Sequence, residues 1–293
     1  MSASHIAILA DRGVVSVAGE DARGFLDNLI TNDMDRLDAV PAIHAGLLTP
    51  QGKILFEMFV VRHGEGYLLE TARATAADLV KRLAIYRLRA KVALNDISAT
   101  RTVVATWGGP LPDLPLAIVY PDPRAGGLGH RAVMPSELAG KVTAEDEGAT
   151  AYDRHRIALG VPEPGRDYVI GDAFPHEAGF DRLAGVSFTK GCFVGQEVVA
   201  RMQHKTVVRK RIVRLEATAP LVQGSEVVVG EAVIGRIGSV DGTQGLAMVR
   251  LDRALEARTK GLALTAGGIP VAVDAEALES YAAADRARAV SGA

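Results

Sequence analysis

The residues best suited to chemistry lie in a glycine-rich segment, residues 185–201, which contains the only cysteine of the chain, Cys192. Lys190 precedes this thiol by two residues, and a nearby ammonium group stabilises the thiolate, the form that reacts or binds metal. Gly191 and Gly195 flank the thiol, and glycine lets a ligand or partner approach the backbone. The pattern predicts an accessible, thiolate-prone cysteine. The alternative is a buried cysteine that packs as a small apolar side chain.

Gln196 and Glu197 follow this thiol, and their side chains could cap a helix or hydrogen-bond a polar ligand. One cysteine cannot form a Cys-rich zinc site, and the seven histidines are scattered without a His-Glu-x-x-His pattern. We therefore expect no metal site within the chain alone.

Two basic stretches could bind an anionic partner. If residues 86–91 form an extended strand, the side chains of Arg87, Arg89 and Lys91 project from one face. Three aligned cations could bind a carboxylate or a phosphate, and the alternative is a solvated strand face. The second stretch, residues 201–214, could contact RNA or an acidic partner. The net charge of −2 favours a solvated linker instead, so nucleic acid is not an expected partner.

The composition is that of a folded protein. The chain has 293 residues, of which 48% are hydrophobic and 23% charged, enough apolar material for about two domains. A single cysteine excludes an intramolecular disulfide scaffold. No apolar run approaches the length of about 18 residues that a membrane-spanning helix needs. The first residues resemble neither a signal peptide nor an arginine-rich transit peptide, so we expect a cytoplasmic location.

The elements that must position these residues do not alternate regularly between strands and helices. Apolar and β-branched runs predict strands at residues 14–18, 43–48, 54–61, 67–70, 101–107 and 116–120. Apolar stripes at helical spacing predict helices from residue 20, after Thr75 and over residues 152–159. After Val207, β-branched runs broken by glycines predict a small antiparallel sheet or barrel. We expect an α+β fold with two domains, residues 1–205, built from two subdomains, and residues 206–293.

The segment Lys-Gly-Cys-Phe-Val-Gly-Gln-Glu at residues 190–197 resembles the signature of the YgfZ family. These are folate-binding proteins of iron–sulfur cluster assembly, related to the glycine-cleavage aminomethyltransferase. Five further segments resemble that family, residues 47–53, 86–92, 156–163, 185–188 and 208–211. The resemblance covers about residues 10 to 255, and its cysteine motif is the most specific part.

The resemblance implies an aminomethyltransferase-like folate-binding body followed by a small antiparallel β-barrel. Tetrahydrofolate or a derivative would lie in a central channel, where the ring of Tyr152 could stack on it. Its glutamate tail would lie near Arg87, Arg89 and Lys91, which suits a ligand with a ring at one end and carboxylates at the other. Ordinary helix packing is the alternative for Tyr152.

The resemblance also implies a function, that of a folate-binding accessory factor that assembles or repairs iron–sulfur clusters. Scaffold proteins and client iron–sulfur enzymes would be its partners. A cluster needs about four protein ligands, so Cys192 could only share one with a partner or with external thiols. The alternatives are a folate-dependent aminomethyl transferase and an RNA-binding module. Ala158 and Phe56 stand where true aminomethyltransferases carry acids, so no glycine-cleavage turnover is expected.

Overall fold

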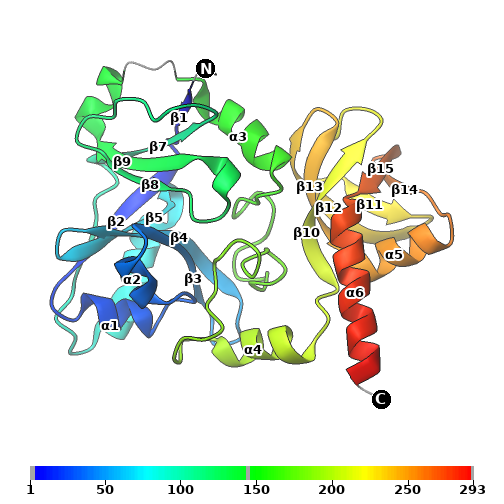
Figure 1. Cartoon of the computed structure of the whole chain (residues 1–293), viewed down its shortest axis with the longest axis horizontal. Coiled ribbons are helices and arrows are strands. Elements are labelled where there is room, and N and C mark those ends of the chain that lie inside the picture. The colour runs from blue at the N-terminus through cyan, green and yellow to red at the C-terminus, as the bar shows by residue number, and fades with distance from the viewer. Residues whose placement is uncertain (1–3, 143–145, 292–293) are drawn as a thin grey trace. The chain divides into compact units, whose positions relative to one another are not determined.

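In the computed structural model, which describes residues 4–142 and 146–291, the chain divides into two compact units (Figure 1). Unit 1 is formed by residues 1–153 and 180–196, and unit 2 by residues 154–179 and 197–293. Each unit therefore contains a segment that lies in sequence between parts of the other. The expected boundary between residues 205 and 206 is a coarser division, and it stays a prediction.

Unit 1 contains a five-stranded antiparallel sheet with the strand order β3-β4-β5-β2-β6. Its strands are β2 (Arg12–Ala18), β3 (Ala42–Leu48), β4 (Ile54–His63), β5 (Gly66–Ala72) and β6 (Ala93–Asp96). The predicted hairpin is confirmed, since β3 pairs with β4 around a turn at residues 49–53. Gly52 in this turn has a φ of +78°, a conformation that glycine adopts without steric cost.

A second antiparallel sheet of unit 1 has the strand order β1-β7-β9-β8. Its strands are β1 (His5–Ile8), β7 (Arg101–Trp107), β8 (Ile118–Pro121) and β9 (His130–Pro135). Short 3-10 helices lie in the connections of this unit, η1 (Met34–Asp38), η2 (Arg73–Thr75), η3 (Gly126–Leu128) and η4 (Ser136–Lys141).

The five-stranded sheet buries both of its faces. Side chains alternate along a strand, so neighbouring residues of β4 enter different cores. On one face, helices α1 (Ala22–Asp27) and α2 (Ala76–Arg87) belong to the core that includes Met58. On the other face, Phe59 belongs to a core shared with the four-stranded sheet. These two faces decide which of the predicted site residues can meet.

Unit 2 is built on a closed antiparallel barrel with the strand order β10-β13-β12-β11-β14-β15. Its strands are β10 (Lys210–Ala217), β11 (Glu226–Val229), β12 (Ala232–Asp241), β13 (Gln244–Arg250), β14 (Leu264–Ala266) and β15 (Ile269–Val273). Within the described residues, the other α-helices are α3 (Gly148–Ala158), α4 (Gln196–Lys205), α5 (Leu251–Thr259) and α6 (Ala275–Ser291). The prediction of a small barrel after Val207 is confirmed.

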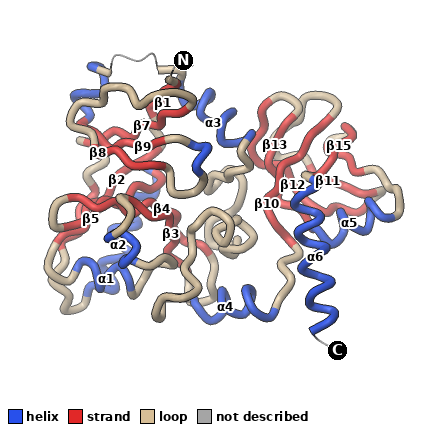
Figure 2. Tube along the Cα trace, in the orientation of Figure 1, coloured by secondary structure: helices blue, strands red, loops and turns tan. Residues whose placement is uncertain are grey.

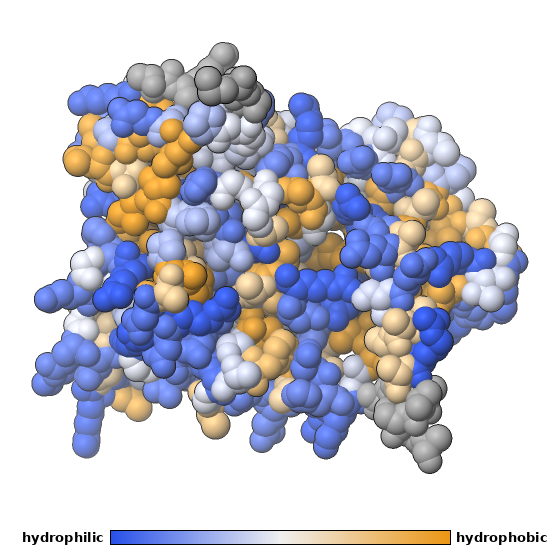
Figure 3. All heavy atoms as spheres, viewed as in Figure 1, coloured by the Kyte–Doolittle hydropathy of each residue, from blue (hydrophilic) through white to orange (hydrophobic). Residues whose placement is uncertain are grey.

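Two antiparallel sheets, a closed antiparallel barrel and separate helices make an α+β fold, as expected. Figure 2 shows that the chain between α3 and α4 is mostly loop, and this loop carries Cys192. On the face drawn in Figure 3, patches of apolar residues lie among hydrophilic ones. No helix within residues 4–142 and 146–291 is long and apolar enough to cross a membrane.

Candidate functional site

The segment that leads to Cys192 is held in unit 1 by two fully buried polar side chains, Thr31 and Asn32. The Thr31 Oγ1 donates a hydrogen bond of 2.6 Å to the carbonyl oxygen of Gly185. The Asn32 Nδ2 donates one of 2.7 Å to the carbonyl oxygen of Ala184. Because a buried polar group that lacks a partner costs about 1–3 kcal/mol, these contacts hold the segment firmly. They fix the start of the stretch that we call the cysteine loop, residues 186–196.

Lys190 points into unit 1. Its Nζ atom donates to the carbonyl oxygens of Asp27, Ile30 and Asn32, at 3.1 Å from Ile30 and 2.9 Å from Asn32. The Lys190 side chain is only 1% exposed, and its Nζ also lies 3.1 Å from the Asp27 carboxylate. Carbonyl groups at the end of a helix lack intrahelical partners and favour a cation. Lys190 therefore anchors the cysteine loop to the end of α1 and to the turn after it, and its stabilisation of the thiolate stays a prediction.

Gly195 lets the other end of the loop pack against the β3–β4 turn. Its φ is +81°, and a Cβ atom added there would lie 2.6 Å from the carbonyl oxygen of Thr49. That distance leaves no room for a side chain, so the close approach requires glycine. Gly191 differs, because a Cβ atom added there meets nothing within 4 Å. Two segments singled out by the family resemblance, residues 47–53 and 190–197, thus contact each other.

Cys192 is exposed between these anchor points. The next residue, Phe193, is buried, and its ring centroid lies 5.5 Å from the Nζ of Lys190. The loop therefore buries the side chains on either side of Gly191 and Cys192 while the thiol itself faces solvent. This placement agrees with the expected accessible thiol and disagrees with a cysteine that fills the core. A chemical role for Cys192 stays a prediction.

Gln196 and Glu197 begin helix α4. The backbone N–H of Gln196 donates to the carbonyl oxygen of Phe193 over 3.2 Å, which joins the loop to the helix. Glu197 is exposed in the first turn, where a carboxylate stabilises a helix by interacting with its dipole. A helix-start role thus accounts for both residues. Their contact with folate stays a prediction.

The predicted strand over residues 86–91 is wrong. Helix α2 continues through Arg87, and the chain turns only at Leu88. The physical reason is the spacing of Leu83 and Tyr86, three residues apart, which both contact the core on the helical face of the sheet. Because α2 is a helix up to Arg87, the cations of residues 86–91 do not project from one side as they would from a strand.

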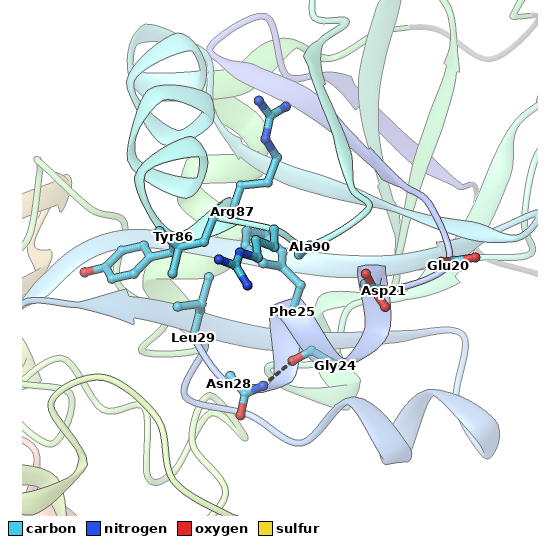
Figure 4. Close-up of a pocket in the computed structure, with 11 residues that line it drawn as sticks. Glu20, Asp21, Gly24, Phe25, Asn28, Leu29, Tyr86, Arg87 and Ala90 are labelled. Carbon is cyan, nitrogen blue, oxygen red and sulfur yellow. Dashed lines mark hydrogen bonds between the residues drawn. The ribbon is translucent and has the colours of Figure 1, made fainter.

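The structure separates the predicted folate-contacting residues. Arg87 and Arg89 line a cavity of about 510 Å³ between α1 and the end of α2 (Figure 4). Lys91 forms an ion pair with Glu20, and its side chain is 74% exposed. Tyr152 belongs to the core on the opposite face of the five-stranded sheet. The structure therefore does not bring Tyr152 and the basic residues into one site, contrary to the expectation.

Tyr152 is surrounded by protein. Its ring packs edge-on against Trp107, with 5.7 Å between the ring centroids. Its hydroxyl oxygen accepts hydrogen bonds of 2.9 Å from Nη2 of Arg124 and from Nη1 of Arg131. Burial and these bonds agree with the packing alternative for Tyr152.

The Tyr152 hydroxyl is part of a buried charge network that the sequence analysis missed. The network consists of three arginines and three carboxylates, each at most 5% exposed: Arg12, Arg124, Arg131, Glu57, Glu70 and Asp122. Nε of Arg12 donates to Glu70 over 2.9 Å and its Nη1 donates to Glu57 over 3.2 Å. Nη2 of Arg124 donates to Asp122 over 2.9 Å. Equal numbers of opposite charges are thus buried together, and Nε of Arg131, on β9, donates to Glu70, on β5, over 3.0 Å from one sheet to the other.

The arginines keep these buried carboxylates ionised. Burial by itself raises the pKa of Asp122, but the charge and hydrogen bonds of Arg124 outweigh burial and hold this pKa at about 2. Burial also raises the pKa of Glu70, but the charge of Arg131 outweighs burial, and the pKa of Glu70 is lowered. The pKa of Glu57 is also below its usual value, because arginine and histidine neighbours outweigh its burial. Removing one member would leave an uncompensated charge in the core.

The fold is shared with a solved aminomethyltransferase. The structure of glycine cleavage system aminomethyltransferase T from Bartonella henselae matches with a TM-score of 0.75 at 17% sequence identity, covering 93% of this chain and 85% of that chain. Residues 209–277 match the family model of the CAF17 C-terminal beta-barrel domain. The chain therefore has an aminomethyltransferase-like fold that ends in a closed barrel, and this expectation is confirmed.

The sequence comparison gives the family. Iron–sulfur cluster assembly factor IBA57 from Homo sapiens is 33% identical over 275 residues, covering 82% of this chain and 76% of that protein. The IBA57 homologue from Mycosarcoma maydis is 35% identical, covering 72% of this chain and 56% of that protein. The one from Neurospora crassa is 31% identical, covering 70% and 52%. The chain belongs to the IBA57 family of iron–sulfur cluster assembly factors, and it spans about half the length of these fungal relatives.

The names of the relatives also correct the sequence analysis. All three are named as mitochondrial proteins, which contradicts the cytoplasmic location expected from the sequence. The resemblance to iron–sulfur assembly proteins is confirmed at the level of the IBA57 family, and the narrower assignment to YgfZ stays a prediction.

Proposed function

We propose that this chain takes part in assembling or repairing iron–sulfur clusters, with Cys192 at the contact with a partner protein or with the cluster. The observation that carries the proposal is an exposed thiol on a loop anchored by Lys190 and Gly195. An anchored loop presents its thiol in one position, as a metal ligand or a docking contact requires. Further support comes from the relatives, which are named as iron–sulfur cluster assembly factors.

The partner would supply most of the cluster ligands. Among residues 4–142 and 146–291, no group of three or more His, Cys, Asp or Glu residues is arranged to hold a metal ion. A cluster is usually held by about four side chains, mostly thiolates. Cys192 would therefore contribute one ligand, while a scaffold protein or a client iron–sulfur enzyme contributes the others.

Reduced folate is the small-molecule ligand that we propose, as tetrahydrofolate or a derivative. Support comes from the sequence resemblance and from the fold shared with aminomethyltransferase T. Within the cysteine motif, Gln196 and Glu197 carry the polar side chains suited to such a ligand. Because Tyr152 and the basic residues lie on opposite faces of a sheet, one folate molecule would use at most one of these two regions.

A folate-dependent transferase is the less favoured alternative. Ala158 and Phe56 stand where the transferases carry acids. Glu57, the acid next to Phe56, is buried and accepts hydrogen bonds from Arg12 at 3.2 Å. A carboxylate held in this way is not free to move a proton for a substrate.

Complementation tests the role of the thiol. In cells that lack the native protein, we expect Cys192→Ser to leave client iron–sulfur enzymes inactive, although the folded variant accumulates normally. Thr189→Ser is the matched control, since this exposed residue of the same loop should tolerate the change and restore activity. If the Cys192→Ser variant restores enzyme activity as well as the native chain, the proposed role of the thiol is wrong.

A titration with tetrahydrofolate tests the ligand. We expect isothermal titration calorimetry to show saturable binding of tetrahydrofolate to the chain. Arg87→Glu and Tyr152→Phe then report on the two separated regions, and weaker binding in either variant assigns the ligand to that region. The absence of saturable binding would contradict the folate proposal and leave the test of Cys192 untouched.

A further inference from the structure

The ends of α1 and α2 border a cavity that the proposed role of Cys192 does not use. Its volume of about 510 Å³ is within the usual range for small-molecule sites. Phe25 and Leu29 form its apolar part, and both belong to the core of unit 1. In Figure 4, Tyr86 and Leu29 lie at one end of the cavity, and Asp21 and Glu20 lie at the opposite end. The cavity thus has an apolar end and an acidic end.

The two carboxylates of the cavity already have partners. Glu20 forms an ion pair with Lys91. Asp21 accepts the backbone N–H of Lys91 at its Oδ2 over 2.7 Å. Arg87 and Arg89 also line the cavity, and within the described parts of the chain neither guanidinium has an ion pair or a hydrogen bond to another residue. In Figure 4 the Arg87 side chain extends away from Phe25 and Leu29, so Arg89 is the uncompensated cation that we assign to the cavity.

The backbone between the two arginines is strained. Leu88 has a φ of +42° and a ψ of −106°, a conformation that residues other than glycine rarely adopt. Its side chain is 89% exposed, so burial of the leucine does not compensate the strain. Strained residues concentrate at ligand sites, where the surrounding structure needs the conformation. At this position the turn lets Arg87, at the helix end, and Arg89, beyond it, line the same cavity.

We propose that this cavity binds a small organic anion, a carboxylate on an aromatic or otherwise apolar body. Arg89 binds the carboxylate through charge-assisted hydrogen bonds, and Arg87 adds positive charge at the rim. The apolar body lies against Phe25 and Leu29, which already form the inner wall. This site is independent of the proposed role of Cys192, because it contains no residue of the cysteine loop. It overlaps the Arg87 region of the folate titration, and binding of a simple aromatic carboxylate without binding of tetrahydrofolate would distinguish the two ligands.

The acidic end of the cavity excludes a ligand that carries a second negatively charged group. Glu20 and Asp21 would repel a second anionic group at that position. A neutral group with N–H donors suits it better, because carboxylate oxygens accept hydrogen bonds. The ligand class is therefore an apolar monocarboxylate, and a polyanion such as a nucleic acid does not fit.

Binding of naphthaleneacetate to the full chain tests this site, and naphthaleneacetamide serves as the neutral ligand of the same shape. We expect saturable binding of the acid and binding of the amide that is weaker by about tenfold, the effect of losing one charge-assisted bond. Arg89→Gln should weaken binding of the acid by a similar factor and leave binding of the amide unchanged. Lys81→Gln, on the same helix and 76% exposed, is the matched control and should have no effect.

A second variant tests the space itself. Gly24 lines the cavity, and a Cβ atom added there meets nothing within 4 Å. The Gly24→Leu variant should therefore fold, because leucine favours a helix more than glycine does. Its larger side chain should occupy the cavity and reduce binding of both probes. The proposal is overturned if the native chain does not bind the acid, if the amide binds as tightly, or if Arg89→Gln binds the acid as the native chain does.

Discussion

The Nζ atom of Lys190 lies 2.9 Å from the carbonyl oxygen of Asn32, and this contact fixes the backbone two residues before Cys192 to the turn that follows α1. The same ammonium group also binds the carbonyl oxygens of Asp27 and Ile30. The lysine of the motif thus acts on the thiol through the position of the backbone. The first prediction follows from this contact.

Lys190→Met should loosen the cysteine loop. Methionine keeps much of the length of the side chain but leaves the carbonyl groups of Asp27, Ile30 and Asn32 without their donor. We expect the free energy of unfolding to fall by about 1–3 kcal/mol in urea denaturation. Alkylation of Cys192 should also become faster as the loop moves more. Lys81→Met, at an exposed position of α2, is the control, and equal stability of the two variants would contradict the anchoring role.

Gly195→Ala should destabilise the protein, while Gly191→Ala should not. At Gly195 the added Cβ would lie 2.6 Å from the carbonyl oxygen of Thr49, and the φ of +81° disfavours alanine in any case. A residue forced into such a conformation costs about 1–3 kcal/mol. At Gly191 the added Cβ meets nothing within 4 Å. Denaturation midpoints that drop equally in the two variants would disprove the close packing of the loop on the β3–β4 turn.

Cys192 should react with iodoacetamide in the native protein. The thiol is exposed, so no unfolding step should be needed before the reagent reaches it. Mass spectrometry after a short reaction should show one modified site per chain, and Cys192→Ser should show none. A thiol that reacts only after denaturant is added would be a buried packing residue, contrary to the structure.

The buried carboxylates should make the protein lose stability in acid. The pKa of Asp122 is about 2 in the folded protein against an ordinary value of 3.8. A lowered pKa means that the stabilisation is complete above about pH 5 and is lost as the pH falls toward the folded value. For Asp122 alone the loss is about 2 kcal/mol, and Glu70, whose pKa is also lowered, adds to it. Thermal unfolding between neutral and acidic pH measures this slope.

Asp122→Asn separates the pairing from other effects of acid. The variant should unfold more readily at neutral pH by about 3 kcal/mol, since Arg124 keeps a buried charge without its carboxylate. Its stability should then depend less steeply on pH than that of the native chain. Asp78→Asn, at an exposed position of α2, should keep the native slope. A native slope in Asp122→Asn would mean that this carboxylate does not titrate with unfolding.

Local pattern was sufficient to predict much of the fold. The turn at residues 49–53 and the apolar strands beside it predicted the β3–β4 hairpin, because both signals act over a few neighbouring residues. The glycine-broken runs after Val207 predicted the barrel for the same reason. The local pattern failed at residues 86–91, where alternating cations suggested a strand. There the apolar residues at helical spacing, Leu83 and Tyr86, extend helix α2 instead.

The buried network had only a faint signal in the sequence. Glu57 and Glu70 are acids within otherwise apolar strands, which marks a charge at an inward position. The identity of their partners could not be inferred, because Arg12 and Arg131 come from strands distant in the chain. Which charges meet depends on how the two sheets pack.

The sequence by itself determined the positions of the turns, the barrel and the single thiol with its glycines, because these depend on residue types that act within a few positions. Only the tertiary structure decided what the motif residues contact. It turned Lys190 toward carbonyl groups at the end of α1 and in the turn after it, and it placed Cys192 in solvent. It also placed Tyr152 and Arg87 on opposite faces of one sheet. The physical reason is that such contacts join residues far apart in the chain, whose meeting is set by the burial of apolar surface on both faces of that sheet.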